Sequence, residues 1–203
     1  MKNYIVTISR EFGCNAREIG RTLASRLGVP FYDKDLVDLT ARKAGINLEI
    51  VKESDEVINN QNRLFSEFIY GSSSSFYSEK AIEAQAFVIR DIANKRKSCV
   101  MFGRCADYIL REHSNVINFF LYAPLEKRIE HIASTYELSE KNAEKMVKRI
   151  DNQRHNYYKY VTGRNRGDRS GKHVMFDVSA YGVKGSVDLM YEAIHIMFAE
   201  DDK

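Results

Sequence analysis

The fold is decided by the stretch Ile5-Val6-Thr7-Ile8-Ser9-Arg10-Glu11-Phe12-Gly13-Cys14-Asn15-Ala16-Arg17-Glu18-Ile19-Gly20. Its β-branched run ends at a polar turn that contains glycine, and apolar residues then recur at helical spacing. A strand, a tight turn and a helix N-terminus bring backbone N–H groups and the helix dipole together on an anion. The usual phosphate-binding P-loop reads GxxxxGK[ST], but Ala16, Arg17 and Glu18 stand here where its lysine and hydroxyl are expected. The stretch therefore predicts either a rebuilt phosphate loop or an ordinary strand–helix corner.

The composition indicates one globular unit. A chain of 203 residues is long enough for one α/β domain with an inserted subdomain, and we expect a single domain over residues 1–203. With 44% hydrophobic and 29% charged residues, and neither a membrane-length apolar run nor a signal-peptide profile, we expect a soluble protein without a membrane partner. Cys14, Cys99 and Cys105 are odd in number and form no CxxC pair, which predicts no disulfide framework or zinc site and a cytoplasmic location.

The rest of the chain alternates strands with helices. We expect strands at 3–8, 99–102, 115–122 and 174–178, and a brief extended piece at 31–33. Helices are expected at 16–28, 34–44, 47–57, 79–95, 105–110 and 183–197, and from residues 124 and 139 onward. This order predicts a three-layer α/β fold, in which a parallel sheet is flanked by helices and ligands bind at the carboxyl ends of the strands. The serine-rich, aromatic segment 59–78 is either a substrate-covering flap or a surface loop.

Polar residues follow three of the strand ends. They are Ser9–Glu18 after the first strand, Asp33 after the short extended piece, and Gly103-Arg104 with Asp107 one turn later. Arginine at such a corner suits phosphate, because the guanidinium fork matches two oxygens. The alternative is a salt bridge to a nearby carboxylate.

Positive charge is concentrated in one region. Residues 145–172 hold nine Lys or Arg against only Asp151 and Asp168, whereas the net charge of the chain is +3. Arg149, Asp151 and Arg154 fall on a predicted helix there, which could act as a lid that neutralises a transferring phosphoryl group and excludes water. The alternatives are a solvated basic face or nonspecific nucleic-acid contact, and we do not expect nucleic acid to be the partner.

These blocks, in this order, resemble the cytidylate kinase-like family, a bacterial branch of the P-loop nucleoside monophosphate kinases. The resemblance covers nearly the whole chain. It rests on Ile8–Gly13, Arg17–Gly20, Leu23-Ala24, Leu27-Gly28, Pro30–Asp33, Cys99-Val100, Gly103–Leu110, Asp151, Arg154, Tyr157-Tyr158, Thr162-Gly163 and Gly167-Asp168. The family's loop is similar to SREFGSGGREIG, so Cys14-Asn15-Ala16 replace a Ser-Gly-Gly segment here.

The resemblance implies a P-loop NTPase-like fold with a helical monophosphate-binding insertion near residues 35–95 and a lid near residues 128–172. It implies ATP binding by the loop, through Gly13, Cys14, Asn15, Ala16, Arg17 and Glu18. Asn15 tolerates a left-handed conformation, whereas Ala16 adds a Cβ where close backbone approach is wanted. Arg17 would supply the missing positive charge, and Glu18 would coordinate Mg²⁺ or cap the helix.

The other implied roles concern the acceptor and the transfer. Substrate-binding candidates are Asp33, Arg104, Asp107, Arg149 and Asp151, with Arg104 facing the acceptor phosphate, and catalytic candidates are Arg17, Arg104 and Arg154. The implied activity is an ATP- and Mg²⁺-dependent kinase that transfers the γ-phosphoryl group to a nucleoside monophosphate, cytidylate by analogy. The alternative is a nucleotide- or phosphate-binding protein of the same fold with little or no kinase activity, which the missing lysine favours.

Overall fold

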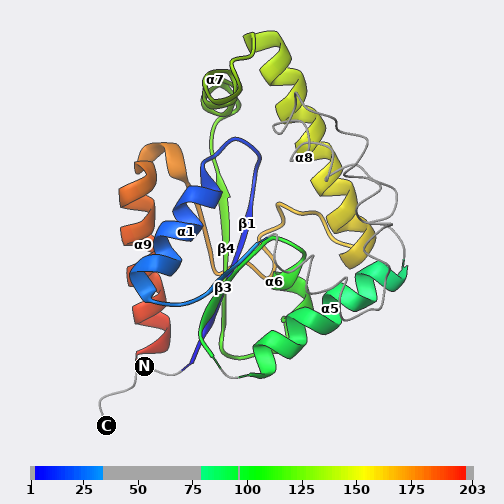
Figure 1. The fold of residues 1–203 in the computed structure, drawn as a ribbon, viewed down its shortest axis with the longest axis vertical. Helices are drawn as coiled ribbons and strands as arrows, with labels where there is room; N and C mark the ends of the chain where they lie inside the picture. Colours follow the sequence, from blue (N-terminus) through cyan, green and yellow to red (C-terminus); the bar gives the residue numbers. More distant parts are fainter. Residues whose placement is uncertain (1–2, 34–78, 96, 200–203) are drawn as a thin grey trace, which may run out of the picture.

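A computed structural model describes residues 3–33, 79–95 and 97–199 of the chain (Figure 1). The helices expected at 34–44 and 47–57, the segment 59–78 and most of the insertion expected at 35–95 lie outside the described residues.

The centre of the protein is a five-stranded sheet in which every described pair of strands is parallel. The strands are β1 (Ile5–Arg10), β2 (Phe31–Tyr32), β3 (Cys99–Phe102), β4 (Val116–Tyr122) and β5 (Val174–Asp177). Their order across the sheet is β2-β3-β1-β4-β5. The central strand β1 is buried on both faces over residues 5–9, as its unbroken β-branched run requires. The predicted parallel sheet is confirmed.

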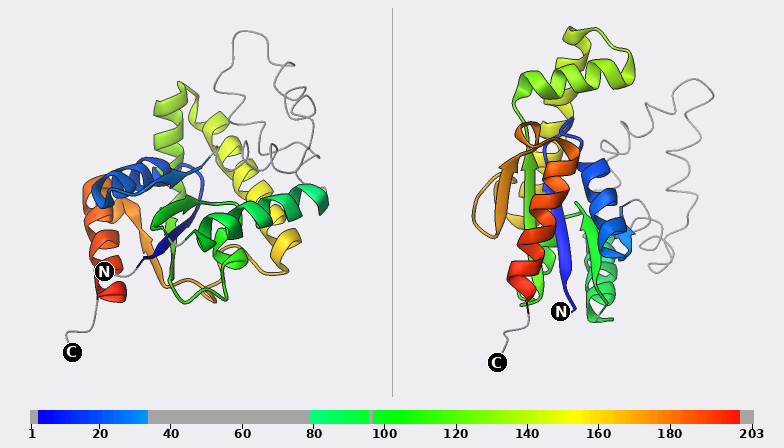
Figure 2. Two further views of the ribbon diagram at one scale, coloured as in Figure 1. Left: turned by 60° about the horizontal axis from the view of Figure 1, so that its bottom comes forward. Right: turned by 90° about the vertical axis from the view of Figure 1, so that its left-hand side faces the viewer.

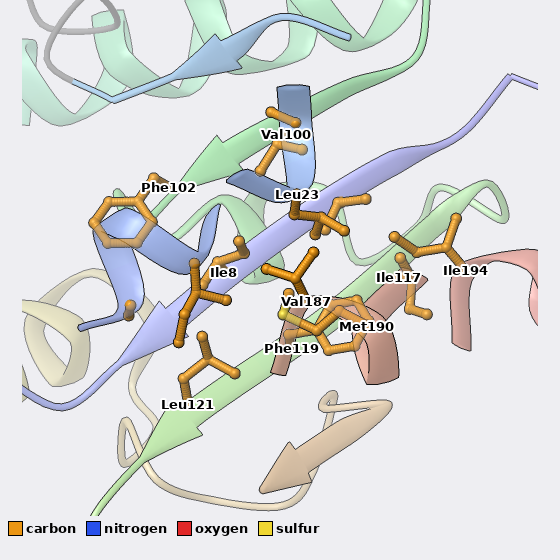
Figure 3. Packing of buried hydrophobic residues seen from close by; sticks show 14 of the residues in the cluster. Ile8, Leu23, Val100, Phe102, Ile117, Phe119, Leu121, Val187, Met190 and Ile194 are labelled. Carbon is orange, nitrogen blue, oxygen red and sulfur yellow. The ribbon is translucent and has the colours of Figure 1, made fainter. Parts of the chain in front are cut away.

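Two groups of helices cover the two faces of the sheet. In Figure 1, α1 (Ala16–Leu27) and α9 (Gly182–Phe198) lie on the left of the sheet, and α5 (Glu79–Asn94) and α6 (Ala106–Ile109) lie on the right; both views of Figure 2 keep α1 and α9 together. One core joins α1 and α9 to the sheet through Ile8, Leu23, Phe119 and Met190 (Figure 3). A second core joins α5 and α6 to the alternate residues of the strands, such as Met101. The three-layer α/β fold is therefore as predicted.

The helices α7 (Leu125–Tyr136) and α8 (Glu140–Thr162) rise beyond the carboxyl ends of the strands (Figure 1). They pack against each other through a small core of their own around Ile132, Ala143 and Val147. A short 3-10 turn, η2 (Val178–Ala180), follows β5. The strand β1 runs two residues further than the predicted 3–8, so that Ser9 and Arg10 belong to the sheet.

Candidate functional site

A cavity of about 410 Å³ opens at the carboxyl end of β1, where the loop 11–15 leads into α1. All six residues predicted to bind nucleotide, Gly13 to Glu18, line it. Further walls come from α7 and α8, through side chains such as Ile132, Tyr136 and Arg154, and from the end of β1 itself through Arg10. The structure thus brings the predicted loop and part of the predicted lid to one cavity.

The loop reaches this position through two left-handed residues. Gly13 has φ +87°, and a Cβ there would lie 3.0 Å from both the carbonyl oxygen of Arg128 and Cγ1 of Ile132. Glycine is therefore required because α7 packs directly against the loop. Asn15 has φ +56° and precedes α1 without a side-chain cap hydrogen bond, which confirms that it adopts the left-handed conformation. The first turn of α1 keeps its N–H groups without partners inside the helix, and such groups bind anions.

The side chains of Cys14 and Ala16 are packed against the protein. Both are buried, and the Cys14 Sγ lies 3.3 Å from the carbonyl oxygen of Glu11 and 3.6 Å from that of Leu121. Burial raises the pKa of the Cys14 thiol to about 11, so the thiol is protonated at neutral pH. These two residues can offer a ligand only their backbone.

Asp151 ties α8 to the loop. Its Oδ1 accepts a hydrogen bond from the Phe12 N–H at 2.9 Å and from Arg166 Nη2 at 2.7 Å, and its Oδ2 accepts one from Arg128 Nη1 at 2.5 Å. Arg128 also donates to the carbonyl oxygens of Phe12 at 3.1 Å and Ala123 at 3.0 Å. The carboxylate predicted to bind substrate therefore already has three donors from the protein.

Arg154 lies three residues after Asp151 on α8 and lines the cavity. Its guanidinium stands 5.2 Å from the centre of the Phe12 ring, and its Nη1 is buried without a hydrogen-bond partner. Burial, together with the nearby charge of Arg166, lowers the pKa of Arg154 to about 10, and Asp151 opposes the shift. Nη1 of Arg166 is likewise buried without a partner. Two guanidinium groups thus retain donors that an anion could satisfy.

Arg17 and Asp33 meet at the other side of the loop. Arg17 Nε lies 2.9 Å from Asp33 Oδ2, which joins the first turn of α1 to the residue after β2. The contact is an ion pair and not an aligned hydrogen bond, because Oδ2 of Asp33 accepts no hydrogen bond within the described residues.

The sequence profile of the cytidylate kinase-like family matches residues 5–180. The chain belongs to this family. Comparison with curated proteins gave no match. Among solved structures, an uncharacterized protein from Eubacterium ventriosum ATCC 27560 is similar at 23% identity and a TM-score of 0.72, covering 96% of this chain and 99% of that one.

Two further structures share the fold. TT1252 from Thermus thermophilus has a TM-score of 0.58 at 14% identity, covering 98% of this chain and all of that one. A shikimate kinase from Bacteroides thetaiotaomicron has a TM-score of 0.54 at 11% identity, covering 95% and 98%. These likenesses establish a kinase-like P-loop fold. Within the described residues, no helix combines the length and apolarity needed to span a bilayer.

None of the five substrate-side residues implied by the family lines the cavity. Asp33 and Asp151 are engaged as described above. Asp107 is buried, and its Oδ2 pairs with Lys172 and accepts a hydrogen bond from the Tyr158 hydroxyl at 3.0 Å. Arg149 is exposed on α8. Arg104 is half-buried in a left-handed conformation with φ +58°, and desolvation lowers its pKa while Tyr157 and Asp33 oppose the shift. Their roles in substrate binding stay predictions.

The metal prediction rests on Glu18, which is exposed at the rim of the cavity. The described residues contain no group of three potential His, Cys, Asp or Glu ligands. Glu11 is the second carboxylate that lines the cavity, but it lies 3.2 Å from Arg128 Nε. One or two carboxylates suffice for Mg²⁺ when phosphate oxygens and water complete its shell. The residues therefore fit a magnesium ion brought in with a phosphate ligand.

Arg10 is the basic residue of the cavity wall at the strand end that sequence reasoning missed. The sequence places it in the turn after the first strand, whereas it is the last residue of β1. Its guanidinium stacks over Phe102, 4.0 Å from the ring centre. The order of the strands could have indicated its position. Because β1 and β3 are neighbours in the sheet, an arginine at the end of β1 lies beside Phe102 and Gly103 at the end of β3.

Proposed function

We propose that this protein is an ATP-dependent kinase of the cytidylate kinase-like family that phosphorylates a nucleoside monophosphate. The observation that carries the proposal is a cluster of partly buried arginines around the loop cavity. Arg10 and Arg154 line the cavity, and Arg166 stands beside Arg154. A cluster of cations that is partly removed from water costs free energy unless an anion compensates it. A nucleotide polyphosphate is an anion that fits a P-loop fold.

The reaction is an in-line exchange of one bond. An oxygen of the acceptor phosphate forms a bond to the γ-phosphorus while the bond from that phosphorus to the bridging oxygen breaks, and ADP leaves with the electron pair. The protein needs no covalent intermediate, because positioning and charge neutralisation provide the rate enhancement. The backbone of residues 13–18 would hold the ATP phosphates, and Arg154 would neutralise charge on the transferring group. Glu18 would hold Mg²⁺, which would supply positive charge to the phosphates as charge develops during transfer.

The proposal includes the roles implied for the rest of the chain. Residues 128–172 would act as the lid, since Arg128 and Asp151 join α7 and α8 to the loop. Arg104 would bind the acceptor phosphate. The cytoplasm, which supplies nucleotides, suits three cysteines that are all buried and free.

The second candidate is a nucleotide- or phosphate-binding protein that transfers little or no phosphoryl group. One observation favours it: no residue from Gly13 to Glu18 is a lysine or carries a hydroxyl group. In a standard P-loop, these groups reach the β- and γ-phosphates and the metal. The two candidates share the cavity and differ only in turnover.

A coupled assay of ADP release separates the two candidates. ATP–Mg²⁺ is combined in turn with cytidine, uridine, adenosine and guanosine monophosphates and their deoxy forms, and ATP binding is measured in parallel by calorimetry. The kinase proposal expects turnover with at least one acceptor. ATP binding without turnover on any of them would support the second candidate.

Matched variants on α8 test the assigned group. R154Q removes a cavity cation, whereas K148Q removes a cation of the same helix that is bonded to Glu144 in solvent. We expect R154Q to lower kcat/KM by about a hundredfold or more, which is the scale of a lost transition-state donor, and K148Q to leave it unchanged. If the two substitutions changed kcat/KM equally, Arg154 would have no specific role in phosphoryl transfer.

A further inference from the structure

Arg10 is held in place from two sides at the carboxyl end of β1. Its guanidinium lies flat over the Phe102 ring, 4.0 Å from the ring centre. Gly103 leaves room for it, because a Cβ on Gly103 would lie only 2.3 Å from Arg10 Nη1. The aromatic ring and a side-chain-free backbone thus fix a planar cation between the ends of two neighbouring strands, at the wall of the cavity.

The charges around Arg10 are mostly of the same sign. Arg154, Arg166 and Arg17 all lower its pKa, in addition to burial, and Asp33 opposes the shift. The carboxylates nearby are already engaged, since Asp33 pairs with Arg17 and Asp151 pairs with Arg128 and Arg166. Within the part of the chain that the structure describes, the Arg10 side chain makes no ion pair or hydrogen bond, and it contacts the ring of Phe102.

A cation with free donors, fixed among other cations beside a helix N-terminus, is arranged for an anion with several charges. We propose that Arg10 binds the terminal phosphates of the polyphosphate and so replaces the lysine of the standard P-loop. Arg17, the residue expected to supply this charge, is directed to Asp33 instead. The identity of the ligand rests on the proposed function, whereas the arrangement of charges around Arg10 is observed independently of that function.

Arg10 would approach the ligand from the strand, whereas a P-loop lysine comes from the start of the helix. A guanidinium provides two parallel N–H groups to one phosphate, and a lysine provides a point charge. The chain can therefore bear Ala16 and Arg17 at the usual lysine position without losing the positive charge at the terminal phosphate.

The test measures binding of inorganic tripolyphosphate by calorimetry in the absence of magnesium, together with the melting temperature of the ligand-free protein. R10M removes the charge and keeps an apolar stem against Phe102, and R10Q serves as a second variant if R10M does not fold. R26Q is the matched control, because Arg26 also stacks 4.0 Å from an aromatic ring, that of Tyr191, but lies on α1 facing α9 and outside the cavity.

We expect R10M to weaken tripolyphosphate binding by about ten- to a hundredfold, the range for hydrogen bonds to a charged group, and R26Q to leave it unchanged. The ligand-free melting temperature of R10M should stay the same or rise, since one of several buried cations is removed. Unchanged affinity in R10M, or a fall in melting temperature with no specific loss of affinity, would overturn the role of Arg10.

The outcomes also separate this inference from the proposed function. If tripolyphosphate binds through Arg10 but no acceptor is phosphorylated, the inference holds and the kinase proposal fails. If the protein phosphorylates an acceptor and R10M binds tripolyphosphate as well as the wild type does, the kinase proposal holds and the inference fails.

Discussion

Asp151→Asn tests whether the contact between α8 and the loop holds this part of the protein together. The carboxylate of Asp151 receives hydrogen bonds from the Phe12 N–H, Arg128 and Arg166. Asparagine has nearly the same shape, but its amide turns an N–H₂ group toward one of these donors and carries no charge. The substitution therefore leaves at least one guanidinium group without its partner.

The expected loss follows from burial. Removing one partner of a fully buried ion pair costs about 3–5 kcal/mol, and a hydrogen bond to a charged group contributes about 1.5–3 kcal/mol. The Asp151 side chain is 19% exposed and that of Arg128 is 9% exposed, so the lower part of the range applies. We expect D151N to lower the free energy of unfolding by about 3 kcal/mol. For a chain of this length, that corresponds to a fall in melting temperature of about 6–12 °C.

The assay is urea unfolding of the ligand-free protein, with D188N as the matched control. Asp188 also has two basic partners, Arg26 and Lys184, but its side chain is 43% exposed. A surface pair contributes about 0–1 kcal/mol and is screened by salt. We expect the loss in D151N to persist in high salt and the loss in D188N to be small. An equal, salt-sensitive loss in both variants would refute the reasoning.

Three further predictions concern the loop, the second core and the thiols. G13A should lower the free energy of unfolding by about 2 kcal/mol more than G28A in urea titrations, because both positions have positive φ but only the Gly13 Cβ would meet a backbone atom, the carbonyl oxygen of Arg128 at 3.0 Å. K172M should cost about 3–5 kcal/mol in the same assay, because it strips the buried Asp107 of its cation, and a loss below about 1 kcal/mol would contradict this reasoning. Burial raises the pKa of the three cysteine thiols from about 9 to about 11 or 12, so the unfolded chain loses these protons at a lower pH than the folded chain. The free energy of unfolding should therefore fall above pH 9 by about 1.4 kcal/mol per thiol and pH unit. A cysteine-free variant whose free energy of unfolding falls with the same slope would contradict this.

The architecture was predictable because the strands of a parallel sheet are buried on both faces. Unbroken apolar runs such as Cys99–Phe102 mark these strands in the sequence, and helical periodicity marks α1 and α9. The loop and its cavity were predictable for the same reason, since the turn after the first strand must lie at the carboxyl edge. The left-handed conformation of Asn15 also follows from its residue type.

The partners of the charged side chains were not predictable in the same way. Asp151 and Arg128 are far apart in the sequence, and no local pattern indicates that both would meet the backbone of Phe12. Asp107 follows a strand end, as a ligand residue would, but its helix turns it into the core toward Lys172. Arg10 was overlooked because its position depends on the neighbour of its strand and not on its own spacing. Charge placement is a tertiary property, whereas burial pattern is largely local.

Two hydrogen-bonded contacts, at different points along the helix, hold α8 against the rest of the protein. Its lower half is held by the hydrogen bond from Tyr158 to Asp107, and Asp151, seven residues earlier, is held to the loop. About 10 Å of helix separates these anchors, at 1.5 Å per residue. If α8 moves as the lid of the proposed kinase, the part of the helix that bears Asp151 can leave the loop only when the hydrogen bonds of this one carboxylate to Phe12, Arg128 and Arg166 break together. We would then expect the strength of these bonds to limit the rate at which a product departs.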